Sequence, residues 1–480
     1  MMWGRSLALP LAGATSLALA LGWGLTLNQQ LSLLALVALL GVLASASPAS
    51  AWVGAALVAA LTFKGLATLG VLPSVATFVD LPLAWGALFV ALIKGNEQTA
   101  FLRRHLQWLS ALAVAVALAW AFNPSEFLRP VLYFMLLGEP FAIVGALIAD
   151  PPSRRARLIL ERMLLALVVI QIPLCALQLL WIGPSDKVQG TLYGAAAGAH
   201  VTSAVVVVGA IWILSRVSTR QMHAWWLIVV PLLFLIPFVA DAKQVIVALP
   251  AIVLASSWRV GRGQLLVRSV LAVGSVVALF TLVPAGDAAE RFITTGREDG
   301  GKGAVAHFIW QRMGYDPASV AFGIGPAETV SRAAFMTVYS PETGSPLASL
   351  GLRPAEIAVE AQGVALGGSY AKWTDTSSFN TGVSSTVGVL GDLGILGLVV
   401  YMGLLLSLFQ RLRTESSPEA VAAAAGFALF FVLGLVFDWW EQPPFGVCLG
   451  VLAGLALSKG APVIPPHPAW SKNTLAKGAI

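Results

Sequence analysis

Charged residues are scarce in this chain. Only 11% of its 480 residues are Asp, Glu, Lys or Arg, whereas 58% are hydrophobic and the mean hydropathy is +0.83. A soluble domain carries about 25% charged residues. The shortage therefore argues against an ordinary soluble protein and predicts a polytopic membrane protein.

Cysteine is rarer still, and histidine is sparse. Cys175 and Cys448 both fall inside apolar runs, and only five histidines occur in the chain. We expect the two cysteines to be small buried hydrophobes rather than a disulfide or metal ligands. Because no His/Cys cluster has the spacing of a metal site, we predict no metal and no cofactor.

Acidic residues are outnumbered by basic ones, 23 to 29, which gives a formal net charge of +6. In a soluble protein this excess would suggest nucleic acid. Here the basic residues cluster in short loops between apolar runs, which the positive-inside rule explains better. We therefore predict no nucleic-acid partner. No internal repeat, low-complexity tract or soluble domain linker is present.

Apolar runs fill most of the chain, and a membrane-spanning helix needs about 20 such residues. We predict an all-α polytopic membrane protein with about fourteen transmembrane helices, within a range of about 12–14. The first run resembles a signal peptide, but the predicted sides of the loops and termini agree only if it is counted as a retained helix. The predicted spans are 6–26, 31–46, 51–72, 81–94, 107–123, 128–149, 158–182, 192–214, 225–240, 244–257, 267–284, 386–409, 419–437 and 444–459.

Basic residues occupy alternate loops in this order of spans. They are Arg103 and Arg104; Arg154, Arg155, Arg157 and Arg162; Arg216 and Arg220; Arg259, Arg262 and Arg268; and Arg411 and Arg413. All then lie on one side of the membrane, which must be the cytoplasm. We therefore predict a multi-pass protein of the bacterial inner (plasma) membrane with both termini cytoplasmic.

One stretch has a different composition. Residues 286–385 are rich in charge and cannot lie in hydrocarbon, so we expect a large periplasmic lobe between the eleventh and twelfth spans. The predicted division is a transmembrane part at 1–285, the lobe at 286–385, further spans at 386–460 and a cytoplasmic tail at 461–480. We interpret the lobe as the acceptor side of an active site.

The external helix ends carry polar residues that a passive anchor would not need. One group comprises Asp186, Lys187 and Gln189, followed by Gly190-Thr191 and then His200. We place His200 about two turns into its helix, where a packing role and a catalytic role are both open. Lys187 and Gln189 are candidates for substrate binding.

A second polar group, Asp241, Lys243 and Gln244, falls between two apolar runs. A lysine at that depth is costly unless it is paired or meets an anion. Lys243 is therefore either a diphosphate-binding cation or a structural partner of Asp241. Two further charges, Lys64 and Glu139, lie within predicted spans. They could pair with each other, line a lipid groove or belong to a proton path.

Candidates also occur in and after the lobe. Trp310 and Arg312 precede a glycine-proline turn at 322–326, and we expect that turn to bring Arg312 to the membrane surface. Asp375 and Asp392 are candidates for function, although helix capping would explain each of them equally well. The glycines around Asp392 favour close helix packing.

The order of these elements resembles bacterial O-antigen ligases and O-antigen polymerases, which are membrane glycosyltransferases with one large late periplasmic loop. The similar motifs are Gln189-Gly190-Thr191, Asp241-Ala242-Lys243-Gln244, Trp310 to Arg312, Gly323-Ile324-Gly325-Pro326, Phe379-Asn380, and Gly391-Asp392-Leu393-Gly394-Ile395-Leu396-Gly397. The likeness covers residues 180–405. It departs at Lys243, where an arginine is usual, and at Ser378, where the ligases have a histidine.

The resemblance implies transfer of a glycan from an undecaprenyl-diphosphate carrier to a hydroxyl on a glycan, lipid or protein acceptor. Membrane lipids would be further partners. Such chemistry needs cations at the membrane surface and no metal. On this basis Arg312, Asp375 and His200 are the predicted catalytic residues, with His307 as another base. The predicted substrate-binding residues are Lys187, Gln189, Asp241, Lys243, Gln244 and Trp310.

Two other classes stay open. A transporter or flippase of lipid-linked glycans would commonly show two related halves with polar midplane sites, whereas this chain is asymmetric with one dominant late lobe. A structural membrane protein without chemistry is the other class. A glycosyltransferase with its acid in the first external loop is disfavoured, because the stretch near Asn28 contains no carboxylate.

Overall fold

The computed structural model describes residues 48–72, 77–94, 99–194, 197–242, 301–336 except 315, 352–365, 384–435 and 437–458, with single positions between 244 and 252. These residues form helices and no β-strand, which confirms the all-helical prediction. Six helices are long and apolar enough to cross a membrane: Ala49–Thr68, Ala100–Phe122, Leu128–Ala149, Arg154–Ile182, Gly198–Ser218 and Ser385–Thr414. Ala224–Val239, Pro418–Gly434 and Pro443–Leu457 are shorter apolar helices.

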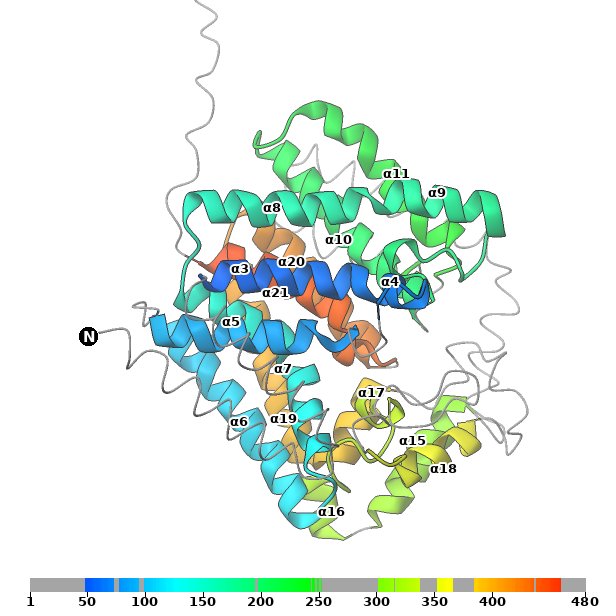
Figure 1. Cartoon of the computed structure of the whole chain (residues 1–480). Coiled ribbons are helices and arrows are strands. Elements are labelled where there is room, and N and C mark those ends of the chain that lie inside the picture. Colours follow the sequence, from blue (N-terminus) through cyan, green and yellow to red (C-terminus); the bar gives the residue numbers. More distant parts are fainter. Residues whose placement is uncertain are drawn as a thin grey trace, which may run out of the picture.

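The elements used below, in chain order, are α3 (Ala49–Val58), η1 (Ala59–Phe63), α4 (Lys64–Thr68), α5 (Asp80–Lys94), α6 (Ala100–Phe122), α7 (Leu128–Ala149), α8 (Arg154–Val169), α9 (Gln171–Ile182), η3 (Gly190–Leu192), α10 (Gly198–Ser218), η4 (Ala224–Ile228), α11 (Val229–Val239), α15 (Gly301–Met313), α16 (Pro317–Phe322), α17 (Arg332–Phe335), α18 (Glu356–Ala365), α19 (Ser385–Thr414), α20 (Pro418–Gly434), η7 (Trp439–Glu441) and α21 (Pro443–Leu457). Figure 1 shows this arrangement.

Ten of the predicted spans coincide with these helices, and the span at 128–149 has the same bounds as α7. The spans at 6–26, 31–46 and 267–284, and most of 244–257, lie outside the described residues. The total of about fourteen spans therefore stays a prediction, made from apolar run length.

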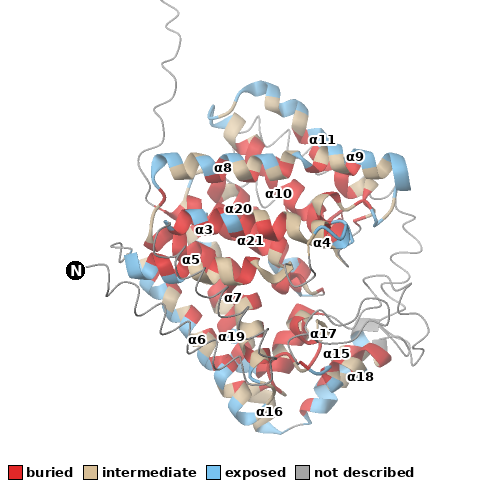
Figure 2. Cartoon of the chain, in the orientation of Figure 1, coloured by how far each residue is buried: buried red, intermediate tan, exposed pale blue. Residues whose placement is uncertain are grey.

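Helix α7 forms the centre of the bundle. Every residue from 136 to 149 is buried, and α5, α6 and α21 pack around it. Figure 2 shows buried residues concentrated in these helices. A helix that is apolar on all sides must be enclosed by others, and α7 and α21 both fit this description. Gly450 of α21 brings the two backbones together, because a β-carbon there would lie 2.7 Å from the Pro140 carbonyl oxygen.

Basic helix ends gather on one face of the bundle. Arg157 and Arg216 pair with Glu161 at 3.0 and 2.6 Å, and with Glu419 at 3.7 and 3.3 Å. These four residues join the start of α8, the end of α10 and the start of α20. Each is less than a fifth exposed, and mutual pairing offsets the cost of burying the charges.

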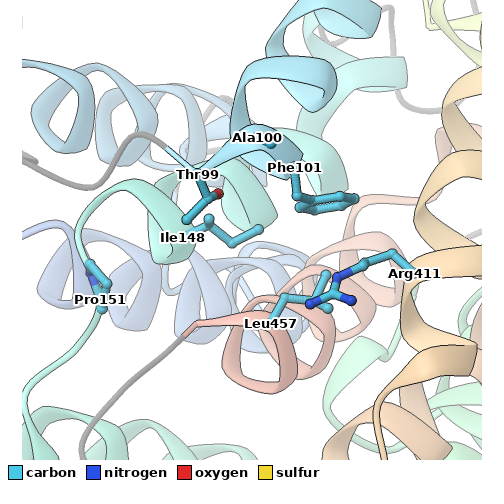
Figure 3. Close-up of a pocket in the computed structure, with 7 residues that line it drawn as sticks. All are labelled: Thr99, Ala100, Phe101, Ile148, Pro151, Arg411 and Leu457. Carbon is cyan, nitrogen blue, oxygen red and sulfur yellow. The ribbon is translucent and has the colours of Figure 1, made fainter.

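The end of α19 belongs to the same face. The Arg411 guanidinium lies over the Phe101 ring at the start of α6, 6.0 Å from the ring centroid. Figure 3 shows a pocket of about 220 Å³ there, lined by Thr99, Phe101, Ile148 and Arg411 among others. The basic ends of α6, α8, α10 and α19 thus share one face, as the alternate basic loops require. Which compartment this face meets stays a prediction.

The lobe helices α15 to α18 lie beneath and to the right of the bundle in Figure 1. They share a small apolar core formed by Val305, Ile309, Met313, Val330 and Ala361. The lobe packs against the end of α6, the start of α7 and the first half of α19. These ends lie opposite the basic face.

The loop between α16 and α17 lies directly on α19, and the glycines of that helix make this possible. The Ile324 N–H donates to the Gly391 carbonyl oxygen at 2.6 Å. A β-carbon on Gly391 would lie 2.7 Å from the Thr329 hydroxyl, and one on Gly394 would lie 2.4 Å from the Ala321 carbonyl. Gly394 also has φ +67°, a conformation that favours glycine. The expected close packing at these glycines is confirmed.

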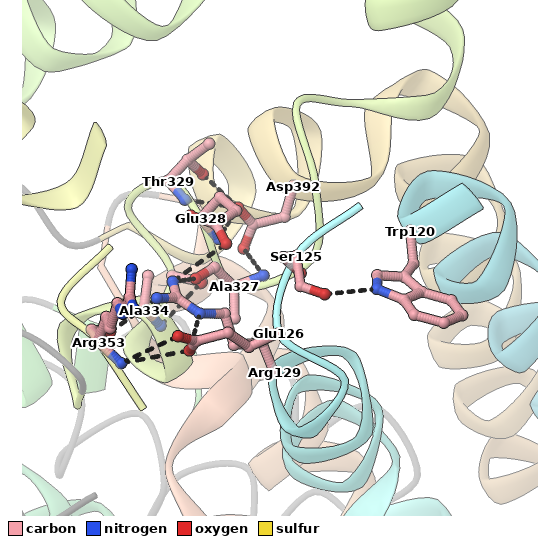
Figure 4. Close-up of polar contacts among 11 residues, drawn as sticks. Trp120, Ser125, Glu126, Arg129, Ala327, Glu328, Thr329, Ala334, Arg353 and Asp392 are labelled. Carbon is pink, nitrogen blue, oxygen red and sulfur yellow. Dashed lines mark hydrogen bonds and ion pairs between the residues drawn. The ribbon is translucent and has the colours of Figure 1, made fainter. Parts of the chain in front are cut away.

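Asp392 holds this loop in place. Its carboxylate accepts N–H bonds from Ala327, Glu328 and Thr329 at 3.1, 3.2 and 2.8 Å, and a hydroxyl bond from Thr329 at 2.7 Å (Figure 4). A buried carboxylate with four donors is fully used. Asp392 is the eighth residue of α19, whose N-cap is Ser384, so the helix-capping interpretation is wrong. Its carboxylate instead holds the backbone of the loop at 327–329.

Arg129 at the start of α7 forms a second attachment. It pairs with Glu126 at 3.2 Å and with Glu328 at 3.1 Å, and it donates to the Arg353 carbonyl oxygen at 2.7 Å (Figure 4). Burial raises the pKa of Glu328 to about 7, and the Arg129 guanidinium opposes this shift. The lobe is thus tied to the bundle by two polar links, one at Asp392 and one at Arg129.

Candidate functional site

Charged residues from the bundle and the lobe meet where α4, α5, α17 and the segment before η7 come together. Lys64 opens α4, Asp80 opens α5 and Arg332 opens α17. Lys64 interacts electrostatically with Arg332, Asp80 and Asp438. Asp80 is buried and interacts with both cations. Two basic residues, Lys64 from the bundle and Arg332 from the lobe, therefore lie within electrostatic range of the same carboxylates, Asp80 and Asp438.

Arg332 has a defined partner and unused donors. Its Nη1 donates to Asp438 Oδ2 at 3.0 Å, and Gln442 Nε2 donates to the same oxygen at 2.8 Å. The side chains of Arg332 and Asp438 are 13% and 23% exposed. No described residue hydrogen-bonds to the buried Arg332 Nε. The side chain is 13% exposed, so its guanidinium can meet an anionic ligand, and its fork geometry suits a phosphate.

The short helix that carries Arg332 is held at its N-terminus by two hydrogen bonds. The Ser331 hydroxyl caps α17 by accepting from the Ala334 N–H at 3.3 Å. The Ala333 N–H donates to Glu441 Oε2 at 3.0 Å. Burial raises the pKa of Glu441 to about 8, against the lowering effect of that N–H. Glu441 is therefore mostly protonated at pH 7, which limits the negative charge beside Arg332.

Lys64 lies next to the predicted Gln189-Gly190-Thr191 motif. A β-carbon on Gly65 would lie 2.2 Å from the Thr191 carbonyl oxygen, so α4 and η3 touch through their backbones. One turn later, a β-carbon on Gly194 would lie 2.2 Å from Thr68. The motif and the bundle cation are thus neighbours, although they are more than 120 residues apart in sequence.

Two glutamines of α9 hold the motif. Gln171 donates to the Thr191 hydroxyl at 2.8 Å and accepts from the Thr191 N–H at 2.9 Å. Gln178 accepts from the Gln189 and Gly190 N–H groups, both at 2.8 Å. Gly190 has φ +57°, and a β-carbon there would lie 2.0 Å from Gln171 Oε1. Sequence reasoning missed these glutamines, although two amides seven residues apart in an apolar run were a usable signal.

The first polar group is only partly brought to the site. Gln189 Nε2 donates to the Asp186 carbonyl oxygen at 2.9 Å, and Lys187 is exposed. His200 is the third residue of α10, so its predicted position two turns into the helix is wrong. The helix starts later than expected because Gly190 and Gly194 both adopt positive φ, which interrupts it.

The second polar group reaches the site through η7. Gln244 Oε1 accepts a hydrogen bond from Trp439 Nε1 at 2.9 Å, directly beside Asp438. Asp241 follows α11 with φ +48°. Lys243 lies outside the described residues. Gln244, the residue after Lys243 in sequence, therefore contacts the residue that follows Asp438.

Arg312 and Trp310 face elsewhere. The Arg312 guanidinium pairs with Glu360 of α18, and both side chains are 47% exposed. It also lies over the Phe308 ring. Trp310 is 42% exposed, and His307 bonds to Gln311 on the same helix. The geometry thus favours Arg332 over Arg312 as the cation nearest the bundle. Asp375 and Ser378 lie outside the described residues.

The charges continue into the bundle. Glu139 of α7 is fully buried, and neither of its carboxyl oxygens has a hydrogen-bond partner among the described residues. It interacts electrostatically with Asp80. Asp80 therefore interacts electrostatically with both charged residues that the sequence analysis placed within spans, Lys64 and Glu139. Sequence reasoning did not single out Asp80, Arg332, Asp438 or Glu441, because their proximity depends on tertiary structure.

In the part of the chain that the structure describes, no three His, Cys, Asp or Glu residues are placed to hold a metal ion. No family model matches the chain, and no curated protein matches it. The candidate site is therefore defined by its own contacts: two cations, their carboxylate partners and two motif segments at the junction of bundle and lobe.

Proposed function

We propose that this protein is a membrane glycosyltransferase. It transfers a glycan from a polyprenyl-diphosphate donor to an acceptor hydroxyl on the external face of the membrane. One observation carries the proposal: Lys64 from the bundle and Arg332 from the lobe share one polar cluster beside Gln189-Gly190-Thr191. A lipid-linked donor enters from the bundle and an aqueous acceptor from the lobe, so a site between the two parts suits both.

The reaction breaks the bond between the anomeric carbon and the diphosphate oxygen. A new bond forms from the acceptor oxygen to the same carbon, and the acceptor loses a proton. Negative charge grows on the leaving diphosphate during this step. Arg332 stabilises that charge with its unused donors, and Lys64 adds a second positive charge. No step requires a metal if these cations supply the charge.

The acceptor proton needs a base. Asp438 is the partly exposed carboxylate of the described site, and Arg332 and Gln442 hold it in a fixed position. It is the base that the described geometry favours. Asp375 remains the candidate that the sequence predicts in the segment where the ligases have their histidine. Asp438→Asn and Asp375→Asn distinguish the two by which one lowers turnover more at saturating donor.

Lys243 belongs to the same proposal. It lies outside the described residues, but its neighbour Gln244 reaches Trp439 beside the site. If Lys243 binds donor phosphate as a point charge, Lys243→Arg keeps partial activity and Lys243→Ala loses most of it. Full activity of Lys243→Ala in protein that is normally inserted would leave only a structural role.

The test uses purified protein in lipid nanodiscs with a polyprenyl-diphosphate-linked oligosaccharide and a panel of glycan, lipid and peptide acceptors. Mass spectrometry should detect a transferred glycan together with released polyprenyl diphosphate. The double variant Lys64→Gln/Arg332→Gln should abolish both products. Absence of both products from the unmodified protein with every acceptor would refute the proposal.

A transporter of lipid-linked glycans is the second candidate, and Glu139 is the observation that favours it. Fully buried ionisable residues inside a helical bundle are typical of ion and proton pathways. Reconstitution into vesicles separates the two functions. A transporter moves labelled lipid-linked glycan between leaflets and leaves it chemically intact, whereas a transferase consumes it.

A further inference from the structure

A groove lies between α6 and α19, two helices that pack side by side along the bundle (Figure 1). Its volume is about 590 Å³, and both walls come from candidate membrane spans. Arg104, Gln107 and Trp108 line one wall. Gly403, Leu406 and Gln410 line the other. None of these residues belongs to the site proposed for glycan transfer.

The lining changes character along the groove. Arg104 and Gln107 lie in the first two turns of α6, and Gln410 lies in the last turns of α19. Trp108 lies about one turn beyond Arg104, and Leu406 lies about one turn before Gln410. Farther in, Ala111 and Gly403 line the groove, with Ser407 as a further polar residue. The groove is therefore charged at the basic face and mostly apolar toward the middle of the spans. Leu406 is 55% exposed, so the apolar part opens outward to the bilayer.

The packing of Trp108 shapes the floor of the groove. A β-carbon on Gly403 would lie 2.4 Å from the Trp108 ring, so the indole rests directly on the α19 backbone. The glycine lets the large ring lie flat between the helices instead of filling the groove. An apolar chain can then follow the ring face and the Leu406 side chain.

Arg104 gives the groove its charge. It is exposed, and no described residue forms a hydrogen bond or ion pair with it. The nearby Arg411 differs, because Glu415 binds it at 2.7 Å and the Thr414 hydroxyl binds it at 3.0 Å. No acidic residue lines the groove. A cation with two amides beside it and an apolar path beneath it matches an anionic headgroup with an acyl chain.

We propose that the α6–α19 groove binds one anionic glycerophospholipid. Its phosphate lies at Arg104, between Gln107 and Gln410, and an acyl chain follows Trp108 and Leu406. The site lies on the basic face, opposite the lobe. It is therefore separate from the donor site and does not depend on the proposed transfer reaction.

The test measures lipid binding to the purified full chain by native mass spectrometry in a mild detergent. Phosphatidylglycerol and phosphatidylcholine with the same acyl chains are titrated. Glycerol phosphate, which has the phosphate but no acyl chain, is titrated in parallel. Arg104→Gln should weaken phosphatidylglycerol binding about tenfold, because a hydrogen bond to a charged group is lost. Arg104→Lys should recover part of it.

Arg103→Gln is the matched control. It removes the same charge from the adjacent exposed residue, which does not line the groove. It should change binding less than about twofold. The proposal is overturned if both substitutions weaken binding equally, or if phosphatidylcholine binds as tightly as phosphatidylglycerol. Equal binding of glycerol phosphate would also overturn it, because the site would then recognise phosphate alone.

Discussion

Arg332→Ala is the substitution that most directly tests the candidate site. In the structure the Nη1 of Arg332 donates to Asp438 Oδ2 at 3.0 Å, while the buried Nε has no hydrogen-bond partner among the described residues. If these unused donors bind the leaving diphosphate, their contribution grows as negative charge develops there. Loss of one such donor typically lowers turnover by about 10²–10³. We expect Arg332→Ala to fall in that range.

The cost to stability should be smaller than the cost to turnover. Arg332 and Asp438 are 13% and 23% exposed, so their pair is only partly shielded from water. After Arg332→Ala, Gln442 still donates to Asp438 at 2.8 Å. The free energy of unfolding should therefore drop by about 1–3 kcal/mol, the usual range for most single substitutions. Arg332→Lys keeps the charge but loses the fork, so it should recover little turnover.

The assay follows release of polyprenyl diphosphate from a lipid-linked oligosaccharide by purified protein at saturating donor, with KM measured separately. Arg312→Ala is the control from the same lobe. Its side chain is 47% exposed, and its ion pair with Glu360 is of the surface kind, worth about 0–1 kcal/mol. A large loss for Arg312→Ala with little loss for Arg332→Ala would refute the assignment and restore the role that the sequence predicts for Arg312.

Three further outcomes can be checked on the same protein. The pKa of Glu441 rises from 4.5 to about 8 on folding, so its contribution to stability is complete below pH 4.5 and is lost as the pH rises through about 8. Melting temperatures should therefore fall as the pH rises from 4.5 to 8. Glu441→Gln should make this fall smaller. Gly190→Ala should lower the melting temperature, because φ +57° costs a non-glycine residue about 1–2 kcal/mol and a β-carbon would also clash with Gln171 Oε1; an unchanged melting temperature would show that both strain and clash are relieved. An impermeant thiol reagent should label Gln311→Cys in the lobe from outside and Arg155→Cys only after permeabilisation, with little background because both native cysteines are buried; labelling of both from one side would overturn the predicted orientation.

Composition predicted the helices well and their interruptions poorly. The bounds of α7 follow from the apolar residues that dominate 128–149 and from the polar Asp150 after them, although Glu139 and Pro140 lie inside the helix. The start of α10 was misplaced because Gly190 and Gly194 adopt positive φ within a run that looks equally apolar. Hydropathy reports burial, but it does not report local backbone conformation.

The charged residues around Lys64 and Arg332 could not be predicted from the sequence, for a different reason. Lys64 and Glu139 stand out because each lies in an apolar run, but the sequence leaves a direct pair, a lipid groove and a proton path equally open. In the structure Asp80 interacts electrostatically with both, and Arg332 and Asp438 join from segments more than 250 residues beyond Lys64. Electrostatic partners that are distant in sequence leave no periodic signal, so only the tertiary arrangement identifies them.

Asp392 shows how a residue that positions a loop can matter for function without meeting a substrate. Its carboxylate fixes the backbone of residues 327–329, and Ser331 then caps the helix whose first residue is Arg332. Asp392 caps no helix itself, but its carboxylate fixes the loop that leads to Arg332. Asp392→Asn keeps the size of the side chain but weakens the N–H bonds, because a neutral oxygen accepts less strongly than a charged one. It should lower turnover by loosening Arg332 while leaving helix content unchanged. If instead turnover stays at the wild-type level while the lobe detaches from α19, the position of Arg332 does not limit the reaction.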